Sequence, residues 1–157
     1  MSKIRYEAMS SEDASRYRSG GNDAYGMKPE RRISDGTGLP CRHCLDFIAE
    51  GEPYLILAHR PFPAPQPYAE TGPIFIHAEE CPRYAKKYEQ PPVLKSNPDY
   101  ILRGYGLDDR IVYGTGAVTP VEKMEARAEE LLARSDIAYV HVRSARNNCF
   151  QARIDRG

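Results

Sequence analysis

The sequence lacks an excess of charge of either sign. It contains 22 Lys and Arg residues and 22 Asp and Glu residues, so its formal net charge at pH 7 is zero. Nucleic acids and anionic lipid surfaces attract proteins that present a positive field, and a neutral chain has no such field overall. The balance of charge argues against nucleic acid as the partner, although a local basic patch is compatible with it.

Long apolar runs are also missing. No window approaches the ~20 apolar residues that a helix needs to cross a bilayer, and the first seven residues contain no apolar stretch of signal-peptide length. We therefore expect no membrane association and a cytoplasmic location. Four cysteines in 157 residues do not form a disulfide framework, and in a reducing compartment such cysteines are buried, metal-bound or reactive.

The chain shows neither an internal repeat nor the strand–helix alternation of α/β folds. Its length and its 41% of hydrophobic residues predict one globular domain over residues 1–157. Short apolar runs bounded by turn residues predict strands. We expect an α+β fold with a mostly antiparallel sheet, about two helices and a C-terminal β-hairpin. The expected strands cover residues 4–9, 54–59, 73–77, 100–105, 110–114, 137–143 and 149–154.

Two segments carry helix signals. Ser10 followed by Asp13 resembles a capping box and predicts a short helix that ends at Gly20. The clearer helix is predicted to have Thr119 as its N-cap and Pro120 at its first position, and to end near residue 135. A single helical turn is expected around residues 84–88. Proline at every second position from 61 to 67 predicts an extended loop, which leaves the role of residues 60–73 open.

Three cysteines and one histidine offer a metal site. Cys41 and Cys44 have the spacing that lets two thiolates from one turn bind one ion, and His77 and Cys81 form a second pair. Three sulfur atoms and one imidazole suit tetrahedral zinc. The first pair follows a turn and the second lies at a strand end, so two loops can meet at one end of the sheet.

Two other interpretations of these cysteines stay open. Cysteine is among the most buried residue types, so Cys41, Cys44 and Cys81 can simply be small core residues. A redox-active pair is the second alternative, since nearby cationic side chains favour a thiolate. The motif lacks a clear βαβ context, which argues against a thioredoxin-like pair. No glycine follows Cys44 to shape a metal-binding turn.

The C-terminal hairpin is rich in polar side chains. If Val140 and Val142 face the core, then His141 and Arg143 face solvent, a cleft or a partner. Arginine supplies a planar fork for a carboxylate or phosphate, so Arg143, His141 and Asn148 are candidates for binding a small anion. An exposed sheet face decorated with polar cross-strand pairs is the plainer alternative.

Catalysis is the third possibility for this hairpin. His141 is a candidate acid or base near neutral pH, and Cys149 is a candidate nucleophile if His141 lies within hydrogen-bond reach. Loop length does not fix the strand register, so the sequence leaves open whether Cys149 shares a face with His141.

Several motifs together resemble a known family. Pro40-Cys-Arg-His-Cys-Leu45, Gly72-Pro-Ile-Phe-Ile-His77, Leu102-Arg-Gly-Tyr105, and His141-Val-Arg-Ser144 with Asn148-Cys149 are similar to the bacterial family catalogued as domain of unknown function 1203. The resemblance spans nearly the whole chain. It implies a bacterial protein of about this length and supplies no activity, substrate or catalytic residue.

Together these observations favour a small cytoplasmic protein in which zinc stabilises a binding module. Its partner is expected to be a small anion or a protein that meets the polar His/Arg face. The alternative is a metal-free enzyme that uses a His/Arg/Cys pocket, and a pure interaction module is the third hypothesis.

Overall fold

The computed structural model describes residues 3–157 and has the expected α+β architecture. Every pairing between its strands is antiparallel, and β9 and β10 form the expected C-terminal hairpin. The helices are α1 (Ser11–Arg18) and α2 (Met124–Leu132), with 3-10 turns η1 (Pro92–Lys95) and η2 (Val121–Lys123). The strands are β1 (Ile4–Glu7), β2 (Glu30–Ile33), β3 (Leu39–Pro40), β4 (Phe47–Ile48), β5 (Pro53–His59), β6 (Gly72–His77), β7 (Asp99–Tyr105), β8 (Ala117–Pro120), β9 (Tyr139–Ser144) and β10 (Phe150–Arg156).

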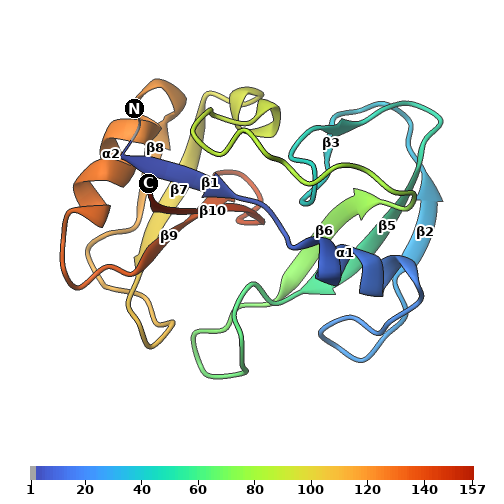
Figure 1. Ribbon diagram of the computed structural model, residues 1–157, viewed down its shortest axis with the longest axis horizontal. Helices are drawn as coiled ribbons and strands as arrows, with labels where there is room; N and C mark the ends of the chain where they lie inside the picture. Colours follow the sequence, from blue (N-terminus) through green and yellow to red (C-terminus); the bar gives the residue numbers. More distant parts are fainter. Residues whose placement is uncertain (1–2) are drawn as a thin grey trace.

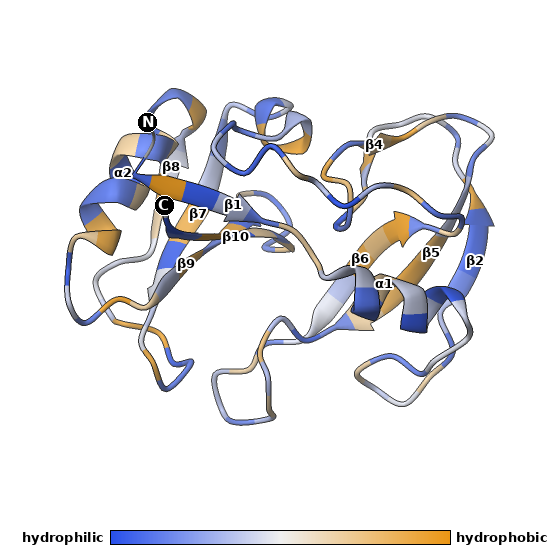
Figure 2. Cartoon of the chain, viewed as in Figure 1, coloured by the Kyte–Doolittle hydropathy of each residue, from blue (hydrophilic) through white to orange (hydrophobic). Residues whose placement is uncertain are grey.

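A five-stranded sheet with the order β1-β10-β9-β7-β8 forms one half of the molecule (Figure 1). Alternate residues of its strands point to one face and pack against α2. The core there is formed by fully buried side chains such as Leu102, Val140, Val142 and Ile154, which meet Met124 and Leu131 of α2. Figure 2 shows the apolar colouring concentrated in the strands and on part of α2.

A three-stranded sheet with the order β2-β5-β6 forms the other half, together with α1 and the short β3-β4 pair. Ala14 and Tyr17 of α1 pack with Leu57 and Ile76 of the sheet in a second hydrophobic cluster. As the sequence alternation predicts, Ile74 and Ile76 share the buried face of β6.

Several polar side chains are buried as well, among them Arg42, His59, His141, Arg143 and Gln151. Arg42 links the two halves of the molecule, since its Nε donates to the Phe150 carbonyl oxygen at 2.8 Å. Buried polar side chains are held in place only when their hydrogen bonds are made. The two halves are therefore joined by specific polar contacts as well as by packing.

The proline-bearing segment 60–73 covers the second face of the five-stranded sheet. Phe62 is 6% exposed, and its ring lies 5.2 Å from the ring of Tyr105 and 5.0 Å from that of His141. Both faces of β9 are consequently buried. Of the three settings expected for His141 and Arg143, solvent is excluded, because their exposed fractions are only 1% and 4%.

The second helix begins later than predicted. Thr119 lies in β8, where it pairs with Tyr100 of β7, and its hydroxyl donates to the Ala117 carbonyl oxygen at 3.2 Å. Pairing with the sheet has overridden the local capping signal. Pro120 is followed by the 3-10 turn η2, and α2 itself runs from Met124 to Leu132.

Two other predicted elements are wrong. Residues 110–114 make only one isolated bridge, between Ile111 and Tyr105, because Asp109 with φ 61° and Gly114 with φ 88° turn the chain at both ends. Residues 84–88 are not helical. The turn of helix in that region is η1, which starts at the second of two consecutive prolines.

Strands β2, β3 and β4 were not expected from the sequence. The residues of β2 are all exposed, so its apolar periodicity is weak, and β3 and β4 have two residues each. These strands depend on pairing with β5 or with each other, which a local pattern does not reveal.

Helix α1 begins as predicted, with the Ser10 side chain accepting a hydrogen bond from the Asp13 N–H at 3.1 Å. We expect Ser10→Ala to lower the free energy of unfolding by about 1 kcal/mol, because this backbone donor loses its partner. Urea titration followed by circular dichroism measures the change. Ser15→Ala, at an exposed position of the same helix, is the control, and an equal loss in both variants would contradict the capping role.

Candidate metal centre

Residues 41–45 form a tight turn between β3 and β4. The Leu45 N–H donates to the Cys41 carbonyl oxygen at 2.9 Å, and the Cys41 N–H donates to the Asp46 carbonyl oxygen. Leu45 adopts φ 54°, a left-handed conformation that glycine usually supplies. Leu45 is fully buried in the larger hydrophobic cluster, and this burial offsets the backbone strain. A leucine therefore closes the turn that lacks a glycine after Cys44.

The second pair of candidate ligands comes from the end of β6. His77 is the last residue of that strand, and Cys81 follows in an irregular segment. A single bridge between Cys41 and Phe75 holds the turn beside β6, and the Arg42 N–H donates to the Phe75 carbonyl oxygen at 3.1 Å. This pairing brings the two loops together at one end of the sheet, as the sequence predicts.

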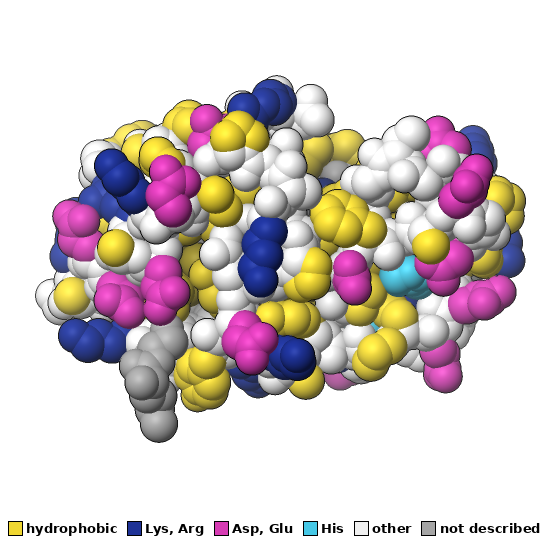
Figure 3. Space-filling view, turned by 90° about the horizontal axis from the view of Figure 1, so that it is seen from above, with side chains coloured by type: hydrophobic (Ala, Val, Ile, Leu, Met, Phe, Trp, Pro, Cys, Tyr) yellow, Lys and Arg dark blue, Asp and Glu magenta, His cyan; other side chains and the backbone are white. Residues whose placement is uncertain are grey.

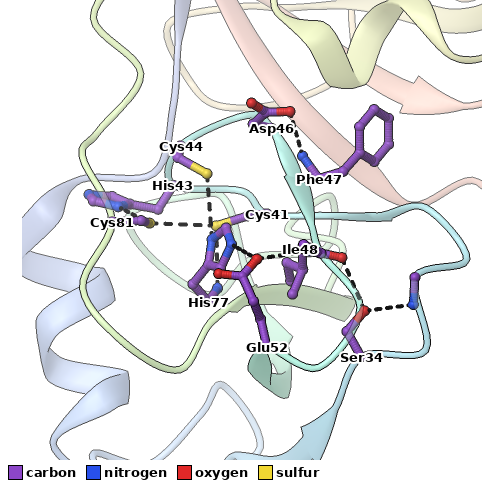
Figure 4. Close-up of polar contacts among 12 residues, drawn as sticks. Ser34, Cys41, His43, Cys44, Asp46, Phe47, Ile48, Glu52, His77 and Cys81 are labelled. Atoms are coloured by element: carbon purple, nitrogen blue, oxygen red, sulfur yellow. Dashed lines mark hydrogen bonds and ion pairs between the residues drawn. The ribbon is translucent and has the colours of Figure 1, made fainter.

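The four side chains converge in one cluster (Figure 4). The ligand atoms of Cys41, Cys44, His77 and Cys81 all lie within 4.8 Å of one another. The Cys41 and Cys81 sulfur atoms are 3.9 Å apart, and Cys44 Sγ lies 3.5 Å from His77 Nδ1. Zinc bonds of about 2.3 Å to sulfur and about 2.0 Å to nitrogen, in a tetrahedron, place ligand atoms about 3.5–3.8 Å apart. The cluster could hold a metal ion.

Neighbouring groups orient and neutralise the cluster. Arg18 of α1 donates through Nη2 to Cys81 Sγ at 3.1 Å, and the backbone N–H of His77 donates to Cys41 Sγ at 3.3 Å. His77 Nε2 lies 3.4 Å from a carboxylate oxygen of Glu52, which leaves Nδ1 directed at the sulfur atoms. A carboxylate on the outer nitrogen of a histidine ligand is a common feature of zinc sites.

The thiols influence one another strongly. The pKa of Cys41 is held far below its usual range because the thiols of Cys44 and Cys81 stabilise its thiolate, and the pKa of Cys44 and of Cys81 is raised by that same thiolate. Without a cation, then, one thiolate forms at the expense of the other two. A divalent cation removes this competition by binding all three as thiolates.

Three groups beside the cluster are not apparent from the sequence. His43 is buried, with Nδ1 3.2 Å from Cys81 Sγ and Nε2 2.9 Å from the Ser11 hydroxyl. Arg18 and Glu52 are the other two. His43 stands inside the Cys-x-x-Cys motif, which is the one local signal for its position. Its sulfur partner is 38 residues away, and that contact depends on the fold.

The structure separates the candidate residues of the C-terminal hairpin. The His141 ring packs among Phe62, Tyr105, Tyr139 and Phe150, with centroid distances of 4.8–5.1 Å. Burial keeps the pKa of His141 well below its usual value, and three arginines near it act in the same direction. This ring is neutral and enclosed by aromatic side chains.

Arg143, Asn148 and Cys149 line one cavity together with Phe150, and His141 is not part of that lining. Asn148 adopts φ 56° in the hairpin turn. The Cys149 thiol points to the Asn147 carbonyl oxygen at 3.6 Å, while His141 Nδ1 has no hydrogen-bond partner within residues 3–157. Cys149 and His141 are thus not joined as a nucleophile and its base.

Within residues 3–157, no helix is long and apolar enough to cross a membrane. Figure 3 shows acidic and basic side chains interspersed over the face of the molecule that it presents, without a large area of one sign. This distribution matches the zero formal net charge.

Comparison with known proteins gives one match. Neither a curated protein nor a solved structure matches the chain. A family model described as "Protein of unknown function (DUF1203)" matches residues 38–156, a range that includes all four residues of the metal cluster and the C-terminal hairpin. The match spans more than two thirds of the chain, and its range includes the motifs at Cys41–Cys44 and His141–Ser144. The chain therefore belongs to the DUF1203 family.

Proposed function

We propose that this chain is a small zinc-stabilised binding module. Cys41, Cys44, His77 and Cys81 bind one structural Zn²⁺ ion, and the cavity lined by Arg143, Asn148 and Cys149 receives a small anion. The observation that carries the zinc assignment is the convergence of three sulfur atoms and one imidazole nitrogen within 4.8 Å. This ligand set and this spacing suit zinc better than they suit harder cations.

A structural role follows from the completeness of the ligand set. Catalytic zinc sites keep one coordination position for water or substrate, whereas structural sites have four protein ligands. Three thiolates and a neutral imidazole leave a single negative charge on a zinc complex, and the Arg18 guanidinium at Cys81 balances it. The ion would tie β6 to the turn between β3 and β4.

The same proposal includes the setting of the protein. A bacterial cytoplasm suits it, because a reducing compartment keeps cysteine thiols available for metal, and all four cysteines are free of disulfides. We also propose that residues 1–157 fold as one cooperative domain, since the Arg42 contact to Phe150 joins the two halves.

Elemental analysis of untagged protein purified without chelator tests the zinc assignment. We expect about one zinc per chain, and we expect a strong chelator to remove the ion and lower the melting temperature, because site formation and folding share the binding free energy. Protein that carries no metal, with three titratable thiols at residues 41, 44 and 81 and an unchanged melting temperature in chelator, would refute the assignment.

A further inference from the structure

A second cluster of polar side chains lies between the two sheets, away from the metal centre. It lines a cavity of about 200 Å³. Arg143 of β9 and His59 at the end of β5 lie in its wall, together with Asn148, Cys149 and Glu70. The cavity opens at the hairpin turn, where Asn148 is exposed and Cys149 is partly exposed.

Arg143, in this wall, has one side-chain donor without a hydrogen-bond partner. Its side chain is 5% exposed. Nη1 donates to the Asn148 carbonyl oxygen at 2.9 Å, while Nε has no partner within residues 3–157. A buried donor of a charged group that lacks an acceptor is costly and uncommon. An acceptor atom from a ligand would satisfy this free N–H donor of the guanidinium.

His59 offers a second unsatisfied group in the same wall. Its Nδ1 is buried without a partner in the described part of the chain. The ring is fixed between Tyr17 and Phe150, with centroid distances of 6.4 Å and 6.1 Å. Burial lowers the pKa of His59 to about 4, so the neutral ring can donate one hydrogen bond to an anion near neutral pH.

The charges around the cavity favour an anion. Glu70 is the acidic residue of its lining, and it is divided between two arginines, at 2.6 Å from Arg103 and 3.6 Å from Arg143. Arg42 is bonded elsewhere, to the Phe150 and Pro40 carbonyl oxygens. Two guanidinium groups thus share one carboxylate, which leaves positive charge beside the cavity.

The size of the cavity and its apolar lining limit the kinds of ligand that it can hold. A volume of about 200 Å³ corresponds to roughly seven water molecules at about 30 Å³ each, which is too small for a nucleotide. Pro61, Pro73, Ile74 and Phe150 supply apolar surface opposite the polar groups. A ligand with a charged head and a short apolar tail fits this division better than a bare inorganic ion does.

We propose that this cavity binds a small organic carboxylate. Its carboxylate group accepts hydrogen bonds from Arg143 and His59, and its short apolar tail lies against the proline and phenylalanine side chains. The inference rests on the proposal that the chain is a binding module, but it does not depend on the zinc ion.

Calorimetric titration of the whole chain, with zinc content measured on the same sample, tests the inference. The probes are butyrate, its neutral analogue butyramide, and inorganic phosphate. We expect saturable binding of butyrate only. Arg143→Gln should weaken it about tenfold or more, because the charge-assisted hydrogen bond from the guanidinium is lost. Arg146→Gln is the matched control, since Arg146 is exposed on the same hairpin and pairs with Asp99 outside the cavity.

A second measurement uses wild-type protein and does not depend on the folding of a variant. Butyrate should slow alkylation of Cys149 by iodoacetamide, read by peptide mass mapping, because Cys149 lines the cavity. Absence of saturable butyrate binding, binding of phosphate alone, or unprotected Cys149 would each overturn the inference. If the protein carries zinc but does not bind butyrate, only this inference is refuted. If the protein as purified carries no metal and still binds butyrate, only the zinc assignment is refuted.

Discussion

Replacing Cys44 by serine is expected to abolish stoichiometric zinc binding and to unfold a large fraction of the chain at 25 °C. A structural zinc site contributes an apparent 10–16 kcal/mol in small zinc domains, roughly the whole stability of a typical domain. Loss of one thiolate leaves two thiolates and one imidazole, which bind zinc far more weakly. Zinc content by elemental analysis and the urea unfolding curve measure the two effects.

Cys149→Ser is the matched control for Cys44→Ser. Cys149 is partly exposed in the C-terminal hairpin and lies outside the metal cluster. This variant should keep about one zinc per chain and change the free energy of unfolding by less than about 0.5 kcal/mol. If both variants were equally stable in the presence of chelator, the cysteines of the cluster would be ordinary core residues.

Replacing Arg42 by alanine is expected to lower the free energy of unfolding by about 3 kcal/mol or more. Arg42 is 3% exposed and donates to the carbonyl oxygens of Phe150 and Pro40, each at 2.8 Å. The alanine variant leaves both oxygens without this donor and opens a cavity between the two sheets. Thermal unfolding, followed by calorimetry, measures the loss.

Two further variants control the Arg42 experiment. Arg31→Ala on β2, at an exposed position, should be nearly neutral. Arg42→Lys keeps the charge but has no planar fork, so we expect an intermediate loss. Two separate transitions in the wild-type chain, with Arg42→Ala affecting neither, would show that the two halves unfold independently and would contradict the single cooperative domain.

The metal cluster could be anticipated from the sequence because its chemistry is carried by residue type and short spacing. Cysteine and histidine, which supply thiolate and imidazole ligands, are identified in a sequence by residue type alone. The pairs Cys41–Cys44 and His77–Cys81 each come from one local segment. The groups around them could not be anticipated. Arg18 reaches Cys81 across 63 positions of sequence, and only the packing of α1 against β6 brings the two together.

The errors in the fold have the same origin. The capping pattern at Thr119 is sound locally, yet β8 pairs with β7 and that ladder outweighs the cap. The alternation in β9 correctly separates Val140 and Val142 from His141 and Arg143. It says nothing about segment 60–73, which ends more than 60 residues before β9 begins and covers the second face. Alternation of polar and apolar residues along a strand shows that its two faces differ in polarity. It does not show that the polar face is exposed to solvent.

The exposed strand β2 has a consequence for the behaviour of the protein in concentrated solution. The outer edge of a sheet offers unpaired N–H and C=O groups to any other chain, and this is a common start of aggregation. Three of the four residues on this edge, Glu30, Arg31 and Arg32, are exposed and charged. The opposite edge strand β6 contains Pro73, which has no N–H to donate. The charged residues of β2 and the proline of β6 make both edges of the sheet unfavourable for pairing with a strand of another chain. A chain with no net charge to keep its copies apart thereby gains protection against strand-by-strand association.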